Sequence, residues 1–126
     1  MSHAILVLHS SNVGQAVQSG NTERCFSLLS AKKIEPLRVD GSDEAQLAPR
    51  DKLFGVSGIR GNYPQVFKVP IGYDVAGGGA ESVEFVGAWG KVEELNEMNE
   101  IPKDVLAANP DIVTLDSVLA NVATSA

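Results

Sequence analysis

The N-terminal part of the chain carries two adjacent side chains that could form a catalytic pair, His9 and Ser10. A histidine beside a serine could supply a base and a nucleophile, yet neighbouring residues on an extended chain point to opposite sides. The G-x-S-x-G turn that exposes a nucleophilic serine is absent. His3 and His9 have no cysteine partner at metal-ligand spacing. We therefore expect no catalytic residue and no metal site.

Sulfur chemistry would depend on Cys25, the only cysteine in the chain. A serine hydroxyl cannot replace it, because only a thiolate attacks a disulfide efficiently at neutral pH. Cys25 lies more than a dozen residues beyond Ser10–Asn12, which is roughly 20 Å along an ideal helix. We expect it to be a small buried hydrophobe. Dithiol catalysis and an internal disulfide are excluded, and disulfide oxidoreductase activity is not expected.

A Tyr63-Pro64 step follows a glycine-rich turn over residues 55–61 and leads into the central apolar stretch. The G-x-x-G-x-x-G spacing of this turn differs from the dinucleotide fingerprint, and it precedes a strand instead of a helix. Residues 66–69 alternate between two faces, as an extended segment does. A proline at the start of a strand is tolerated, because its missing N–H removes no inner hydrogen bond of the sheet.

The N-terminal third predicts a strand followed by a helix. Residues 4–8 form a short continuous apolar run, which is typical of a strand that is buried on both faces. Apolar residues at helical spacing follow, with Ser11 or Asn12 as the expected N-cap. Ser19-Gly20-Asn21 is weak for a helix, so this interval either kinks one helix or separates two. We expect this helix to end near Lys32–Lys33, where positive charge complements the helix dipole.

A second strand and a second helix are expected next. Residues 34–39 predict the strand, and Pro36 favours an edge position for it. Ser42 is expected to cap the helix, with acidic residues in its first turn. Pro49 is expected to interrupt the helix, so that residues 50–54 form a fresh helical turn.

The remaining elements complete a mixed sheet. Residues 70–80 end in three glycines and predict a flexible hairpin connection. Residues 82–86 predict the fourth strand, and a helix is expected from about Lys91 to Ile101–Pro102. The order is strand, helix, strand, helix, strand, strand, helix. We therefore expect an α/β fold with a four-stranded mixed sheet and helices on both faces.

The last part of the chain is too apolar to be a disordered tail. We expect one or two helices there, one of them capped by Asp111 or Thr114. The predicted organisation is one domain over residues 1–102 with a helical tail over residues 103–126 that packs on it.

Composition narrows the classes of partner. The formal net charge of −6 over 126 residues argues against a nucleic-acid partner. No apolar run approaches the roughly 18 residues needed to cross a bilayer, so we expect no membrane partner. The N-terminus lacks the features of a secretory signal, and a single cysteine suits a reducing compartment. A cytoplasmic location is the expectation.

Several short motifs resemble those of the thioredoxin fold in its short glutaredoxin form. Residues 60–67 resemble the glutaredoxin run that ends in Val-Pro-Gln-Val-Phe, and residues 87–95 occupy the place of the glycine turn before the last helix. Within that superfamily the chain is most similar to the Src-homology-3-domain-binding glutamate-rich proteins. Residues 9–14 resemble their serine-rich first loop, and residues 26–34 resemble the end of their first helix. The resemblance covers about residues 4 to 100.

The resemblance implies a thioredoxin-like scaffold without the catalytic cysteine. In that fold the proline after Tyr63 is cis, and the backbone of Tyr63 is an edge on which another chain can dock. The implied function is a redox-inactive protein-interaction (adaptor) module that binds a protein or peptide partner. No cofactor is expected, although the scaffold is compatible with glutathione. The expected binding groove consists of Ser10, Ser11, Asn12, Tyr63, Pro64 and Trp89. The chain has no P-x-x-P motif, and Gly61-Asn62-Tyr63 replaces the proline-rich ligand of that family.

Two other functions stay open at this point. The first is a glutathione-binding, glutaredoxin-like enzyme that uses Ser10 or Ser11 to stabilise a bound thiolate. The second is a structural subunit in which the apolar tail over residues 112–122 mediates homo-oligomerisation. Trp89, the single tryptophan, is either a partner anchor in a turn beside the groove or a half-buried packing residue.

Overall fold

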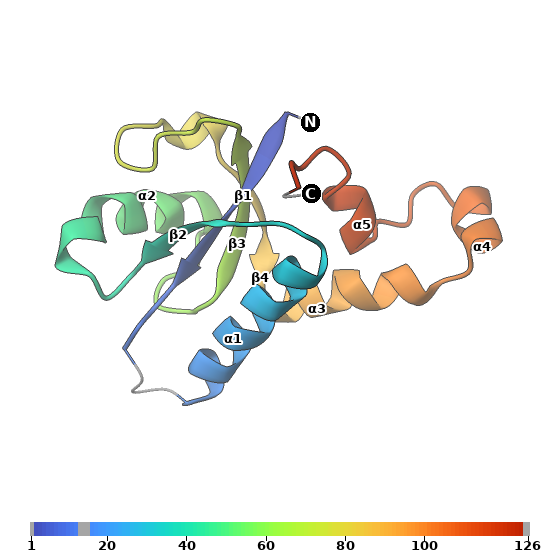
Figure 1. Cartoon of the computed structure of the whole chain (residues 1–126), viewed down its shortest axis with the longest axis horizontal. Helices are drawn as coiled ribbons and strands as arrows, with labels where there is room; N and C mark the ends of the chain where they lie inside the picture. Colours follow the sequence, from blue (N-terminus) through green and yellow to red (C-terminus); the bar gives the residue numbers. More distant parts are fainter. Residues whose placement is uncertain (1, 13–15, 125–126) are drawn as a thin grey trace.

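The computed structural model describes residues 2–12 and 16–124 of the chain. Figure 1 shows a central sheet with helices packed around it. The strands and helices, in chain order, are β1 (His3–His9), α1 (Ala16–Ala31), β2 (Leu37–Asp40), α2 (Leu47–Ser57), β3 (Gln65–Pro70), β4 (Glu84–Ala88), α3 (Trp89–Glu97), α4 (Lys103–Ala108) and α5 (Leu115–Val118). Short 3-10 turns lie at Glu44–Gln46, Ala80–Ser82 and Met98–Glu100. The expected α/β class with a four-stranded mixed sheet is confirmed.

The sheet has the strand order β2-β1-β3-β4. β1 runs parallel to β2, while β3 is antiparallel to both β1 and β4. The register pairs Leu6 with Phe67 and Val7 with Val66. β2 lies at an edge of the sheet, as Pro36 predicts, although the strand is shorter than expected.

Each face of the sheet carries its own apolar core, and β1 contributes to both. Ile5 and Val7 pack in the cluster that α1, α3 and α5 cover, whereas Leu6 and Leu8 pack in the cluster that α2 covers. All four side chains are at most 1% exposed. The expectation that this strand is buried on both faces is therefore confirmed, and so is the placement of helices on both faces.

α1 ends one residue before the predicted Lys32–Lys33. Lys33 adopts a left-handed conformation with φ of 60°. The N–H of Ile34 then donates to the carbonyl of Leu29 at 2.9 Å, which closes the helix end in a Schellman-like turn. The predicted N-cap at Ser11 or Asn12 concerns residues 13–15, which lie outside the described residues.

The predicted start of the second helix needs two corrections. Asp43, not Ser42, caps the 3-10 turn before α2, since its Oδ1 accepts from the N–H of Ala45 at 2.9 Å. Pro49 does not interrupt α2, because it occupies the third position, where helix N–H groups have no intrahelical acceptor. α2 continues to Ser57 and ends at Gly58, which has φ of 73°.

The β3–β4 connection is tied to α2, although its glycines predict a flexible segment. The Lys52 Nζ donates to the carbonyls of Val75 at 3.2 Å and Gly78 at 2.5 Å. The Tyr73 hydroxyl donates to the same Gly78 carbonyl at 3.0 Å. β4 begins two residues later than predicted, because residues 80–82 form a 3-10 turn.

The C-terminal segment returns to the sheet (Figure 1). Thr114 caps α5 in a reciprocal capping box with Ser117, so one of the two expected caps is confirmed. Leu115, Leu119 and Val122 are buried in the same cluster as α1 and α3. Val122 also forms a parallel bridge with His3. No helix in the described ranges is long and apolar enough to cross a membrane.

Candidate functional site

A small polar pocket lies where β1, α1 and the loop before β3 meet. Its volume is about 160 Å³. We call it the Tyr63 pocket, and its lining residues are Ser10, Asn12, Gln18, Ser19, Thr22, Gly61 and Tyr63. Three of the residues predicted for the groove, Ser10, Asn12 and Tyr63, therefore line one cavity.

The backbone of Tyr63 faces α1. The Tyr63–Pro64 peptide bond is cis, as the resemblance implies. The N–H of Tyr63 donates a hydrogen bond to the Oε1 of Gln18 at 3.0 Å. The chain's own side chain thus holds the backbone group that we expected to be available to a ligand. Sequence reasoning missed Gln18, since a contact between residues 45 positions apart leaves no local pattern.

The ring of Tyr63 packs against the loop that follows β2. A Cβ placed on Gly41 would lie 2.5 Å from the Tyr63 hydroxyl oxygen and 2.8 Å from its ring carbons, so only glycine fits beneath this ring. The Phe54 ring centroid is 6.2 Å away. Burial raises the pKa of Tyr63; the Asp40 and Asp51 carboxylates act in the same direction, while Arg50 opposes them.

Pro64 and Gln65 anchor the loop from inside. Pro64 is less than 2% exposed and Gln65 is fully buried. The Gln65 Nε2 donates to the carbonyls of Ile59 at 2.9 Å and Asn62 at 2.8 Å. Its Oε1 has no hydrogen-bond partner among the described residues. Gln65 is the first residue of β3 and directly precedes its apolar positions, and this buried anchor was not among the predicted site residues.

Neither Ser11 nor the buried Pro64 lines the Tyr63 pocket, so these two predicted members of the groove lie outside this cavity. Ser11 has another role. Its N–H donates to the Asp40 Oδ1 at 3.0 Å, and its hydroxyl lies 2.8 Å from the Ser42 hydroxyl. Ser42 gives the same carboxylate oxygen a second N–H and an O–H. Burial acts to raise the pKa of Asp40, but these hydrogen bonds outweigh it and hold the pKa well below its usual range. Ser11 therefore fastens the loop after β1 to β2.

His9 is directed toward α1 and not toward a serine nucleophile. Its ring makes an edge contact with Phe26 at a centroid distance of 5.5 Å. Burial lowers the pKa of His9, with Arg38 acting in the same direction and Asp40 against it. Ser10 instead accepts a hydrogen bond from the N–H of Asn12 at 3.2 Å. This geometry gives no base–nucleophile pair between His9 and Ser10.

Trp89 lies in a different cavity from the other predicted groove residues. It is the first residue of α3 and not part of a turn, and it lines a groove of about 650 Å³ between α1 and α3. No residue that lines this groove also lines the Tyr63 pocket. The predicted single groove is therefore two separate surfaces, because α1 passes between them.

The only thiol is remote from solvent. Cys25 is 1% exposed and packs in the core cluster with Ile5 and Leu29. Burial raises the pKa of its thiol to about 12, so the thiol stays protonated at neutral pH. The expectation of a small buried hydrophobe is confirmed.

Neither the family models nor the curated proteins supply a relative from which a site could be transferred to this chain. The chain matches no family model, and the search of curated proteins found no significant match.

Within residues 2–12 and 16–124, no three His, Cys, Asp or Glu side chains are grouped closely enough to hold a metal ion.

Proposed function

We propose that this chain is a redox-inactive binding module with a thioredoxin-like, glutaredoxin-type fold, and that it holds an extended peptide segment at the Tyr63 pocket. The fold assignment is supported by the strand order β2-β1-β3-β4, by the antiparallel β3, and by helices on both faces of the sheet. The motifs in residues 60–67 and 87–95 support membership of the glutamate-rich protein family.

The observation that carries the proposal is a backbone donor, the N–H of Tyr63, beside a polar pocket whose lining residues include no cysteine. The N–H of Tyr63 is directed at an amide oxygen, the Gln18 Oε1, which has the chemistry of a peptide carbonyl. Ser10, Asn12 and Ser19 surround this position with further polar groups. A peptide could pair with Tyr63 through its main chain and gain specificity from these neighbours.

The size of the pocket limits what can bind. Its volume of about 160 Å³ is below the range of about 300 to 1,000 Å³ that is usual for small-molecule and cofactor sites. It suits one or two residues of an extended segment, with the rest of the partner lying on the surface. We therefore prefer a protein or peptide partner over a bound cofactor. A cytoplasm-like location is also proposed, because a single buried thiol suits a reducing compartment.

Glutathione is a suitable probe, because it is a short extended peptide and also the ligand of the enzymatic alternative. We expect addition of glutathione to shift the amide resonances of residues 10–12, 18–22, 61–63 and 65, and to leave α4 unaffected. Shifts spread over the whole chain, or none at the Tyr63 pocket, would contradict the proposal.

The enzymatic alternative has its own test. Of the two serines considered for thiolate stabilisation, Ser10 lines the Tyr63 pocket and Ser11 does not. A hydroxyethyl-disulfide reduction assay with glutathione should give no turnover above background, because the Cys25 thiol is buried. Turnover that is lost in Ser10→Ala and kept in Ser11→Ala would show that the chain is a serine-dependent enzyme, and it would contradict the proposal of a binding module.

A further inference from the structure

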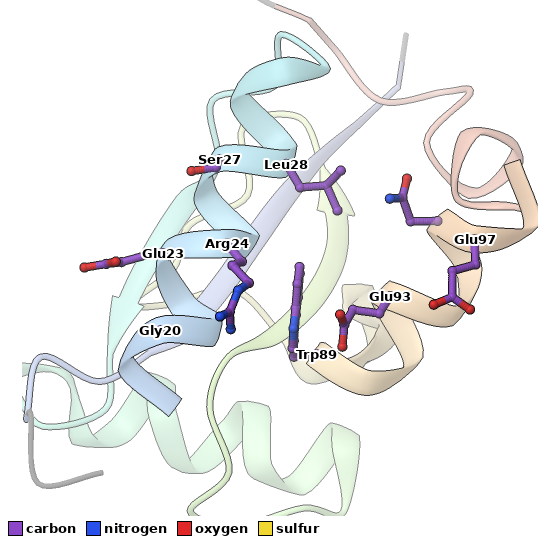
Figure 2. Close-up of a pocket in the computed structure, with 9 residues that line it drawn as sticks. Gly20, Glu23, Arg24, Ser27, Leu28, Trp89, Glu93 and Glu97 are labelled. Carbon is purple, nitrogen blue, oxygen red and sulfur yellow. The ribbon is translucent and has the colours of Figure 1, made fainter. Parts of the chain in front are cut away.

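A cavity of about 650 Å³ lies between α1 and α3. We call it the Trp89 groove. α1 contributes Gly20, Glu23, Arg24, Ser27 and Leu28, and α3 contributes Trp89, Glu93, Asn96 and Glu97. Figure 2 shows the indole of Trp89 standing between the Arg24 side chain and Glu93. The groove thus offers a half-buried aromatic ring that packs against the core on one side and is bordered by polar side chains.

Negative charge predominates along this groove. Glu93 and Glu97 lie one turn apart on α3, and both line the cavity with exposed carboxylates. Glu23 adds a third carboxylate on the α1 side, although Figure 2 shows it directed outward. The one cation of the groove, Arg24, donates from its Nη1 to the Asn21 Oδ1 at 2.9 Å. An occupant would therefore meet more carboxylates than cations.

We propose that the Trp89 groove binds a basic segment of a partner protein, with a lysine or arginine side chain placed against the Trp89 indole and its cationic end at Glu93 and Glu97. A cation over an indole face is attracted by the ring quadrupole. Carboxylates one turn apart can share the N–H groups of a guanidinium or an ammonium in charge-assisted hydrogen bonds. The volume is large enough for a basic side chain and its neighbours, and the net charge of −6 favours the approach of a basic partner.

This surface is independent of the Tyr63 pocket. α1 directs Gln18, Ser19 and Thr22 to the Tyr63 pocket, and it directs residues 20, 23, 24, 27 and 28 to the Trp89 groove. At about 100° per residue these two sets lie on different faces of the helix. Either site can fail its test while the other holds.

Tryptophan fluorescence reports directly on binding in this groove, because Trp89 is the only tryptophan of the chain. The probe is a blocked hexapeptide of alternating arginine and serine, and its counterpart has glutamate in place of arginine. We expect the arginine peptide to change the emission in a saturable way. Added salt should weaken this binding, and the glutamate peptide should have no effect.

The specific contacts are tested with charge-matched variants. Glu93→Gln with Glu97→Gln should weaken binding of the arginine peptide about tenfold, since each exposed pair contributes modestly. Glu94→Gln with Glu100→Gln removes the same charge from residues outside the groove lining, and should change the affinity less than about twofold. Glu94 instead pairs with Lys91 at 3.6 Å. All four carboxylates are exposed, so neither variant should disturb folding.

Three results would overturn the proposal. If both double variants weaken binding equally, the attraction is a property of net charge and not of the groove. If the glutamate peptide binds as well as the arginine peptide, Arg24 is the determinant and the ligand class is wrong. If the arginine peptide gives no saturable emission change, the groove does not bind basic segments.

The role of the indole has a separate test. Calorimetry should show that Trp89→Leu binds the arginine peptide about threefold more weakly than the wild type, because the substitution removes the cation–indole contact.

Discussion

The side-chain oxygen of Gln18 lies 3.0 Å from the backbone nitrogen of Tyr63 and accepts its hydrogen bond. The contact joins the first turn of α1 to the loop before β3. An extended ligand that pairs with Tyr63 needs the same N–H, so its carbonyl must displace the Gln18 amide. Gln18 therefore acts as an internal competitor at the proposed peptide site.

Gln18→Ala should strengthen ligand binding at the Tyr63 pocket. The variant leaves the Tyr63 N–H without this acceptor, so a ligand carbonyl no longer has to break an existing hydrogen bond. Because such a bond contributes about 0.5 to 1.5 kcal/mol net, the affinity for glutathione should rise about two- to tenfold. Amide chemical shifts of residues 61–63 and 65 during titration give the dissociation constant.

Gln18→Glu is the matched control, since it keeps an acceptor oxygen at the same distance from the backbone. It should show no gain in affinity. If Gln18→Ala and wild type bind equally, the Tyr63 N–H is not the ligand donor and the proposed site is wrong.

Alkaline pH should destabilise the protein partly through Cys25. Burial raises the pKa of this thiol from about 9 to about 12 in the folded chain, so the unfolded chain loses the thiol proton first. Between these values the folded state binds more protons, and stability therefore falls as pH rises, by up to about 1.4 kcal/mol per pH unit from this group. Urea unfolding of wild type and Cys25→Ala at pH 8 to 11 measures this contribution.

The difference between the two proteins isolates the thiol, because the lysines and tyrosines are common to both. Cys25→Ala should be less stable at pH 8, where it only loses packing, and should decline more slowly above pH 9. Parallel stability curves would mean that the thiol is ionised as easily in the folded chain as in the unfolded one.

The features that the sequence predicted well are those fixed by local chemistry. The run at residues 4–8 has no polar position, so both faces of β1 had to be buried. Thr114 was one of the two expected caps, and the structure adds that its side chain closes a capping box with Ser117. Cys25 lies among apolar residues at helical spacing, and its burial followed from that pattern.

The features that escaped prediction depend on how elements pack. Pro49 is tolerated because α2 starts two residues before it, and a proline alone does not reveal where a helix begins. The separation of Trp89 from Tyr63 depends on the position of α1 between α3 and the β3 loop. The Gln18–Tyr63 and Gly41–Tyr63 contacts join distant segments, which no local spacing encodes.

Gly41→Ala should destabilise the chain and displace the Tyr63 ring. The added Cβ would lie 2.5 Å from the Tyr63 hydroxyl oxygen, so the ring has to move from its contact with Phe54. Overpacking of this kind costs about 1 to 3 kcal/mol. Urea unfolding gives the loss of stability, and the amide shifts of Asn62, Tyr63 and Gln65 show whether the loop moves.

Gly55→Ala is the same substitution at a helical position of α2 with no atom within 4 Å of the new Cβ. It should raise stability by about 0.5 to 1 kcal/mol, because alanine is the better helix former. If Gly41→Ala behaves like Gly55→Ala, the Tyr63 ring does not pack on Gly41.

Leu115→Ala tests whether the C-terminal segment is part of the folded unit. Leu115 is 2% exposed, and it packs in one cluster with residues of β1, α1 and α3. Truncating a buried leucine to alanine costs about 2 to 5 kcal/mol through lost burial and the cavity left behind. The shift of the urea midpoint at constant slope gives the value.

Val113→Ala is the control, because this neighbouring side chain is 52% exposed. It should change stability by no more than about 0.5 kcal/mol.

The same pair of variants, Leu115→Ala and Val113→Ala, distinguishes packing within one chain from oligomerisation through the tail. If the apolar residues of the tail serve a dimer interface, the exposed Val113 should matter more than Leu115, and light scattering should show a dimer that Val113→Ala dissociates. If they complete the core of a single chain, Leu115→Ala alone should lower stability, with a midpoint independent of protein concentration.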